Sequence, residues 1–201
     1  MTILPLSYLP SVEWFSYAKQ GDCIIDLGEH FIKRSERNRA RILASDGVMD
    51  LTVQVHRANR PRTPMTQMTL DYSKRWQHQH WGALVAAYKG SPYFDYYADL
   101  LAPFYEREWK YLRDYNMEII ELLCREAGIA MPKVSETYID ATDTDIDLRP
   151  KQKFMSEFHA EPYFQVFSDR LPFAENLSFI DLLFAEGPSA VAVLARCLPS
   201  K

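Results

Sequence analysis

The chain has 201 residues, 47% of them hydrophobic and 13% aromatic, which is enough apolar material for a packed core and excludes a chain that is disordered as a whole. No apolar run approaches the ~20 residues of a membrane-spanning helix, and residues 1–9 carry no basic segment ahead of a long apolar stretch. We therefore expect a cytoplasmic protein without a membrane span. The net charge of −4 argues against a general nucleic-acid binder.

The length and the order of predicted elements indicate a single mixed α/β domain over residues 1–201. Residues 1–72 are predicted to be mainly sheet-forming, and residues 73–201 mainly helical, with the helix-rich C-terminal half packed on the sheet. Apolar segments at 3–9 and 23–27 flank a predicted helix over 12–19, for which Ser11 is a plausible N-cap. This strand-helix-strand unit predicts an α/β start.

A β-hairpin is the next predicted element. Asp46-Gly47 separates two β-rich runs at 40–43 and 51–55, and an Asp-Gly pair in that position favours a tight turn. Arg37, Arg39 and Arg41 are spaced two apart, so a regular strand would place them on one face and a bulge would break the alignment. Residues 59–64 hold two prolines and two arginines and are predicted to form a mobile loop.

Helices dominate the predictions for the second half. After a brief strand at 66–70, the spacing predicts helices over 74–89 with Ser73 as cap, over 93–101, and over 104–127 with Gly128 as its end. Residues 133–139 are predicted to be extended, 140–153 a polar loop and 163–167 a short aromatic strand. Asn176 or Ser178 is expected to cap an apolar helix that ends near residue 186, and a further helix follows Gly187-Pro188.

The basic residues are concentrated in one region. Residues 33–62 contain eight basic and three acidic side chains, a net +5 in a chain whose total is −4. Such a region attracts anions. The alternative is that these side chains are solvated on strand faces and paired with acids elsewhere in the fold.

Two constellations are candidates for catalysis. Glu29 and His30 stand just before Lys33, and a carboxylate and an imidazole beside basic residues can combine proton transfer with anion binding. Trp76 and His80 lie one turn apart on a predicted helix, so they share a face that could hold a ring substrate. For each histidine the alternative is a structural polar residue, at a strand edge for His30 and at a core boundary for His80.

The sequence predicts neither a cofactor nor a metal. It lacks both the Gly-rich dinucleotide fingerprint and the P-loop, and its acidic loop lacks the Gly and Glu of a calcium site. The three cysteines, Cys23, Cys124 and Cys197, have no metal-type spacing and are expected to be reduced thiols. Cys23 lies in an apolar strand, where burial suppresses the thiolate, so we rank it below His30 as a reactive group.

Several short segments occur in an order that resembles the WbqC-like protein family, and the resemblance spans nearly the whole chain. They are Tyr8-Leu9-Pro10-Ser11-Val12-Glu13; Glu29-His30-Phe31-Ile32-Lys33; Arg37-Asn38-Arg39; Trp76 with His80-Trp81; Ser91-Pro92-Tyr93-Phe94; Tyr163-Phe164-Gln165-Val166-Phe167; and Asn176-Leu177-Ser178 with Asp181-Leu182-Leu183-Phe184-Ala185-Glu186-Gly187-Pro188. The chain departs from the family pattern at Gln54 and at Arg149-Pro150-Lys151.

The resemblance implies a role in bacterial surface-polysaccharide (O-antigen) biosynthesis. It implies a transferase that moves an acyl or aminoacyl group to a nucleotide-linked amino sugar or a related amine, with a carrier-protein thioester as a possible donor. In that interpretation Glu29 and His30, with His80, are the catalytic residues. The residues expected to bind the anionic substrate, its sugar or its acyl part, or the oxyanion are Tyr8, Lys33, Arg37, Asn38, Arg39 and Trp76.

The main alternative is a non-catalytic module that docks an acidic acyl or peptidyl carrier protein or assembles a glycan-synthesis complex. An enzyme should hold His30 or His80 in a cleft beside the arginines, whereas a docking protein should present the arginines on a convex face. RNA binding is disfavoured because the aromatic residues are not interleaved with the basic ones, so no nucleic-acid partner is expected.

Overall fold

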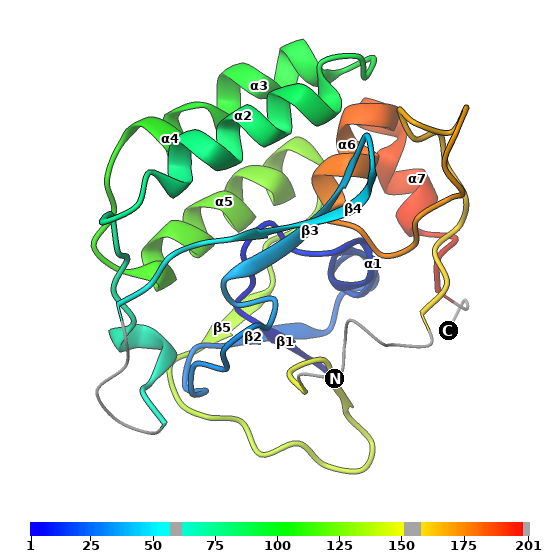
Figure 1. Ribbon diagram of the computed structural model, residues 1–201. Helices are drawn as coiled ribbons and strands as arrows, with labels where there is room; N and C mark the ends of the chain where they lie inside the picture. Colours follow the sequence, from blue (N-terminus) through cyan, green and yellow to red (C-terminus); the bar gives the residue numbers. More distant parts are fainter. Residues whose placement is uncertain (57–61, 151–157, 199–201) are drawn as a thin grey trace.

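A computed structural model of the chain describes residues 1–56, 62–150 and 158–198, and confirms the mixed α/β fold (Figure 1). Four strands, each parallel to its neighbours, form a sheet in the order β5-β2-β1-β6. They are β1 (Thr2–Pro5), β2 (Cys23–Asp26), β5 (Lys133–Ser135) and β6 (Ile146–Asp147). The chain builds the sheet first to one side of β1 and then to the other, so the order reverses between β1 and β6. In open parallel sheets, ligands bind outside the carboxyl ends of the strands at such a reversal.

Helix α1 (Val12–Gln20) links β1 to β2 and confirms the predicted strand-helix-strand unit. The Ser11 hydroxyl accepts a hydrogen bond from the Trp14 N–H at 3.4 Å, which satisfies one of the free donors at the helix start. Gly21, with φ +78°, ends the helix in a conformation that favours glycine. Ile3 and Ile25 are fully buried, because a parallel sheet is covered on both faces.

The predicted hairpin is confirmed and consists of β3 (Arg39–Ala44) and β4 (Gly47–Thr52). Ala44 pairs with Gly47, so Ser45 and Asp46 are the two turn residues, and Gly47 takes φ +120°. Arg37 lies before the first strand. The prediction that a regular strand places all three arginines on one face is therefore wrong, since only Arg39 and Arg41 belong to β3.

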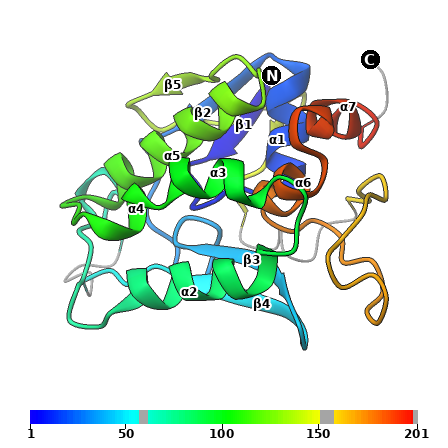
Figure 2. The same cartoon turned by 90° about the horizontal axis from the view of Figure 1, so that it is seen from above.

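The helices form two groups around these sheets (Figures 1 and 2). Helix α4 (Pro103–Glu106) packs against both α2 (Trp76–Tyr88) and α3 (Phe94–Leu101), and α2 lies beside the hairpin. Helices α6 (Phe179–Glu186) and α7 (Ala190–Leu194) pack against α1. The Phe15 and Phe179 rings stack at 4.2 Å, and one cluster of buried side chains runs from Leu4 to Cys197. Within the described ranges, no helix is long and apolar enough to cross a membrane.

The single helix predicted over 104–127 is wrong. The structure has α4, then an extended link, then α5 (Leu112–Glu126). The link pairs with the segment before α2: the Leu70 N–H donates to the Lys110 oxygen, and the Leu112 N–H donates to the Met68 oxygen. These non-local hydrogen bonds replace the helical ones. The helical spacing of apolar residues does not reveal such non-local pairing.

Other segments also differ from the predictions. A short 3₁₀ helix, η1 (Met65–Gln67), replaces the start of the strand expected at 66–70, of which Thr69 and Leu70 form isolated β-bridges, and Arg75 rather than Ser73 precedes α2. Strand β6 lies inside the expected polar loop at 140–153, of which 151–153 fall outside the described residues. Residues 59–61 of the mobile loop predicted at 59–64 also lie outside the described residues.

The expected strand at 163–167 is absent, although the segment lies within the described residues. The Gln165 side chain takes over the role of a strand partner. Its oxygen accepts a hydrogen bond from the Ala174 N–H at 2.9 Å, and its nitrogen donates to the Ala174 oxygen at 3.0 Å. A side chain thus holds two chain segments together where the aromatic pattern predicts a ladder.

Candidate functional site

The carboxyl ends of the parallel strands surround a cleft of about 290 Å³, here called the His30 cleft. Three strand ends contribute to it: Glu29 and His30 follow β2, Tyr138 follows β5, and Asp147 ends β6. The lining residues are Glu29, His30, Ile32, Arg37, Tyr138, Asp147, Arg149 and Pro150. The cleft therefore lies on the edge of the sheet where the topology favours a ligand.

Glu29 and Arg37 form a buried ion pair at the base of this cleft. Arg37 Nε donates to Glu29 Oε1 at 3.1 Å, and Nη2 donates to the second carboxylate oxygen. Both side chains are buried, and the backbone oxygen of Arg37 accepts a hydrogen bond from Asn116 at 2.7 Å. Burial raises the pKa of Glu29, while the Arg37 charge opposes the shift. The pair fixes the chain just before His30.

Arg149 is the second buried cation of the His30 cleft. It makes a two-pronged contact with Asp147, with Nε to Oδ1 at 2.9 Å and Nη2 to Oδ2 at 2.8 Å, and its Nη1 also donates to the fully buried Asp26. Burial lowers the pKa of Arg149, but the hydrogen bonds to Asp147 and Asp26 outweigh it and raise the pKa overall. Its backbone oxygen accepts from Arg37 Nη2 at 2.8 Å, so the two ion pairs form one network.

His30 itself is exposed on the rim of the cleft. Its backbone is held in place, because His30 bridges to Pro64 and the Phe31 N–H donates to the Thr63 oxygen at 2.9 Å. Gly28, two residues earlier, passes so close to the loop after β5 that a Cβ there would lie 2.0 Å from the Tyr138 nitrogen. An imidazole on a fixed backbone, in the same cleft as two buried guanidinium groups, suits a proton acceptor.

A second cleft, of about 360 Å³, is here called the Lys33 cleft. Lys33 and Arg34 are exposed there and have no ion pair among the described residues, whereas Asn38 is buried. The lining residues are Phe31, Lys33, Arg34, Asn38, Thr52, Val55, His56, Met68 and Asp71. Alternate residues of the chain segment 30–33 line different clefts, so this segment forms the wall between them.

Tyr8, Trp76 and His80 come together in the interior rather than in either cleft. The Trp76 and His80 rings lie 5.2 Å apart on α2, as the predicted shared face requires. His80 Nδ1 is 3.0 Å from the Tyr8 hydroxyl, which lies 2.9 Å from the Tyr105 hydroxyl. Burial lowers the pKa of His80 to about 4, and a backbone hydrogen bond to Thr52 opposes the shift. His80 is 5% exposed, which points to a structural role.

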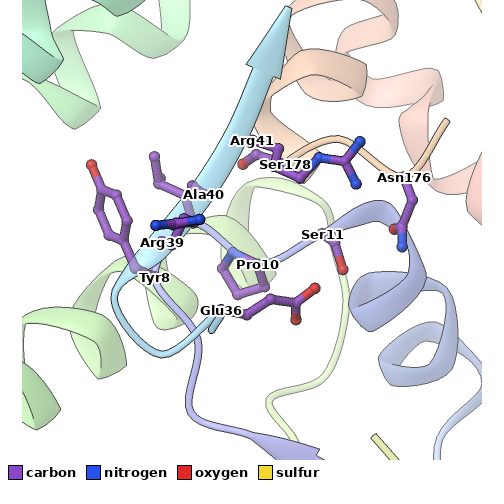
Figure 3. Close-up of a pocket in the computed structure, with 10 residues that line it drawn as sticks. Tyr8, Pro10, Ser11, Glu36, Arg39, Ala40, Arg41, Asn176 and Ser178 are labelled. Atoms are coloured by element: carbon purple, nitrogen blue, oxygen red, sulfur yellow. The ribbon is translucent and has the colours of Figure 1, made fainter. Parts of the chain in front are cut away.

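Arg39 lines a third cavity, of only about 10 Å³ (Figure 3). Figure 3 shows its side chain beside Tyr8 and Pro10, while Arg41 extends from β3 toward Asn176. Arg39 Nη1 also pairs with Asp50 across the hairpin at 2.9 Å. The basic residues of the sequence thus divide among three cavities rather than forming one strip.

Tyr138, Asp147 and Arg149 line the cleft and Asp26 pairs with Arg149, and the sequence pattern predicts none of the four as site residues. The available signal was positional: Asp26 ends an apolar strand, and acidic residues at the carboxyl ends of parallel strands meet at one edge. Strand β6 is two residues long and carries no such apolar run, so Asp147 could not be placed there. Cys23 begins β2 and therefore lies at the opposite edge of the sheet from His30.

Among the residues that the structure describes, no group of three or more histidine, cysteine, aspartate or glutamate side chains is arranged to hold a metal ion. The cations of the His30 cleft are the guanidinium groups of Arg37 and Arg149, both of which face carboxylates.

Comparison with models of known protein families shows the family of this chain. The family model described as the WbqC-like protein family matches residues 7–153. The chain belongs to the WbqC-like protein family. It is also 30% identical over 132 residues to the uncharacterized protein Rv1507c of Mycobacterium tuberculosis, an alignment that covers 65% of this chain and 57% of that protein. No solved structure matches the chain significantly.

The matched region accounts for both larger clefts. Every residue that lines the His30 cleft and the Lys33 cleft lies within 7–153, whereas α6 and α7 lie beyond it. The resemblance recognised from short motifs is therefore confirmed as family membership. The WbqC-like protein described here spans little more than half the length of Rv1507c.

Proposed function

We propose that this WbqC-like protein transfers an acyl or aminoacyl group to a primary amine, with a nucleotide-linked amino sugar of surface-polysaccharide (O-antigen) biosynthesis as acceptor and a carrier-protein thioester as donor. The supporting observation is the position of His30, which is exposed on a cleft at the carboxyl edge of the sheet, beside two buried guanidinium groups. This matches the arrangement expected of an enzyme rather than a convex docking face.

The chemistry assigned to the His30 cleft is an acyl substitution. The acceptor amine attacks the thioester carbonyl carbon, so a C–N bond forms and negative charge develops on the carbonyl oxygen. His30 takes the amine proton, and the ion pairs Arg37–Glu29 and Arg149–Asp147 hold the walls of the cleft in place around the reacting groups. When the intermediate collapses, the C–S bond breaks and the thiolate leaves with the proton that His30 returns.

Glu29 supports this step by holding Arg37 and the chain before His30, and Tyr8, Trp76 and His80 support it from the interior. Buried side chains that pack against one another can preorganise a site without touching the substrate. Lys33, Asn38 and Arg39 lie in other cavities, so they are assigned no proton transfer.

Mass spectrometry tests the proposal. The purified protein is incubated with amines that include nucleotide amino sugars, and with acyl and aminoacyl thioesters, with and without a carrier protein. We expect the acceptor to gain the mass of the acyl group. His30→Gln should abolish the gain, whereas His78→Gln, which alters an exposed histidine of α2, should leave it intact. An unchanged rate in His30→Gln removes the proposed base.

A second candidate is a docking module for an acidic carrier protein. The observation that favours it is the exposure of Lys33 and Arg34, which have no ion pair among the described residues. Docking predicts carrier-protein binding that weakens with salt, and no mass gain on any acceptor in the panel.

A further inference from the structure

We propose that the Lys33 cleft is a binding site for a phosphate ester that also carries an amide or hydroxyl hydrogen-bond donor. The inference rests on the proposed function only in making this ligand one of the two substrates. Binding itself is measured without turnover, so the two ideas can fail separately.

The first supporting observation is the charge of the Lys33 cleft. Lys33 and Arg34 are adjacent, exposed and without an ion pair among the described residues, while Asp71 is the single carboxylate among the lining residues. Hydrogen bonds from Ser73, together with the nearby His56 and Lys74, lower the pKa of Asp71, so it stays ionised. The lining therefore keeps a formal surplus of one positive charge. Adjacent lysine and arginine side chains suit a phosphate, which presents several acceptor oxygens.

The second observation is the backbone at Arg34, which takes φ +55°. This left-handed conformation is uncommon for residues other than glycine, asparagine and aspartate, and it persists only where the surrounding chain enforces it. The turn after Arg34 is held by the Ser35 hydroxyl, which donates to the Ile32 oxygen at 2.6 Å. The two cations are thus presented from a fixed turn.

The third observation is an unpaired acceptor in the wall of the cleft. Asn38 is 6% exposed, and its Nδ2 donates to the Val53 oxygen at 2.9 Å. This bond sets the orientation of the amide, because a flipped amide would place two oxygens against each other. The Oδ1 atom is then a buried acceptor with no partner among the described residues. Buried acceptors are normally satisfied, so a ligand donor would stabilise a small turn of the Asn38 side chain that brings this shielded oxygen to the cleft.

The apolar walls and the volume of the Lys33 cleft further restrict the ligand that it can hold. Phe31, Val55 and Met68 supply apolar surface between the charged rim and Asn38, and the volume of about 360 Å³ lies in the range of small-molecule sites. A ligand that fits all three observations has a phosphate, a short arm with apolar surface, and an N–H or O–H group. A phosphopantetheine arm and a sugar phosphate both have this chemistry.

Calorimetric titration of the full chain with three probes tests the inference. The probes are 4′-phosphopantetheine, N-acetylglucosamine 1-phosphate, and butyl phosphate, which has a phosphate but no further donor. We expect one of the first two to bind about tenfold or more tightly than butyl phosphate, and its identity to reveal the source of the phosphate. Absence of binding by both overturns the proposal, and equal binding of butyl phosphate overturns the role of Asn38.

Two matched variants complete the design. Lys33→Gln/Arg34→Gln should weaken the bound probe about tenfold or more, because both cations are lost. Lys19→Gln/Lys133→Gln removes two exposed lysines, one at the end of α1 and one at the start of β5, and should leave affinity unchanged. Equal weakening in both variants would indicate a net-charge effect and contradict the site. Turnover that survives without probe binding would refute this inference but not the proposed function.

Discussion

The His30 cleft and the Lys33 cleft share one wall but treat charge in opposite ways. In the His30 cleft each guanidinium faces a carboxylate and is buried: Arg37 pairs with Glu29, and Arg149 with Asp26 and Asp147. In the Lys33 cleft the cations are exposed and have no ion pair among the described residues. Paired buried charges fix geometry, whereas unpaired exposed charges attract a ligand. A basic sequence region can therefore serve both purposes within a few residues.

The largest expected effect comes from breaking the buried network. Arg149→Met leaves the fully buried Asp26 without its cation, and removing one member of a buried ion pair lowers the free energy of unfolding by about 3–5 kcal/mol. Urea denaturation measures this loss. The double variant Asp26→Asn/Arg149→Met should recover part of it, since no uncompensated charge stays buried. A loss below about 1 kcal/mol for Arg149→Met would show that the network is not structural.

The pH dependence of the free energy of unfolding tests whether the buried His80 is neutral in the folded protein. The folded-state pKa of His80 is about 4, below the ordinary 6.5, so the folded protein favours the neutral ring. The contribution of His80 to the free energy of unfolding is therefore complete above pH 6.5 and is lost as the pH falls toward 4. The total loss is about 3 kcal/mol. Denaturation midpoints at several pH values, for the wild-type protein and for His80→Asn, measure this slope.

The pH slope of His80→Asn must be subtracted from that of the wild-type protein, because Asp181 changes the free energy of unfolding with pH in the opposite direction. Burial raises the pKa of Asp181 to about 6, so its contribution is lost as pH rises from about 4 to 6. Subtracting the curves cancels this effect. Equal pH slopes in wild type and His80→Asn would contradict a neutral buried His80.

A smaller effect is expected at the edge of the His30 cleft. Gly28→Ala would place a methyl group against the backbone of Tyr138, which must move, and overpacking of this kind lowers the free energy of unfolding by about 1–3 kcal/mol. Gly82→Ala, at an exposed helical position with open space around it, is the matched control and should not destabilise the protein. Thermal denaturation compares them, and equal midpoints would contradict the close approach.

The smallest effect on stability is expected in the Lys33 cleft. Lys33→Gln and Arg34→Gln change exposed side chains without an ion pair among the described residues, so each should alter the free energy of unfolding by no more than about 0.5 kcal/mol. Urea denaturation measures this as well. A loss of several kcal/mol would mean that these cations are structural, and the contrast between the clefts would fail.

The sequence predicts local features well and non-local pairing poorly. Ser11 as the cap of α1, the hairpin around Asp46 and the shared face of Trp76 and His80 follow from spacing over a few residues, and all three are confirmed. The break between α4 and α5 depends on pairing with residues 68–70, which no local pattern reveals. Strand β6 was not predicted for the same reason, because it is defined by its pairing with the distant strand β1.

The candidate site shows the same division. Glu29 and His30 were selected because they are adjacent to each other and near Lys33, and they line one cleft. Arg149 stands 112 residues from Arg37, and the hydrogen bond between them depends on β6 pairing with β1. Whether a cation of the sequence becomes a buried structural charge or an exposed one depends on carboxylates that the chain brings in from a distance.

The most direct test of the account compares His30→Gln with wild type in the acyl-transfer assay, while probe binding to the Lys33 cleft is followed by calorimetry. We expect turnover to disappear in His30→Gln, its probe affinity to stay at the wild-type value, and His78→Gln to be normal in both measurements. Transfer by His30→Gln at the wild-type rate would contradict it.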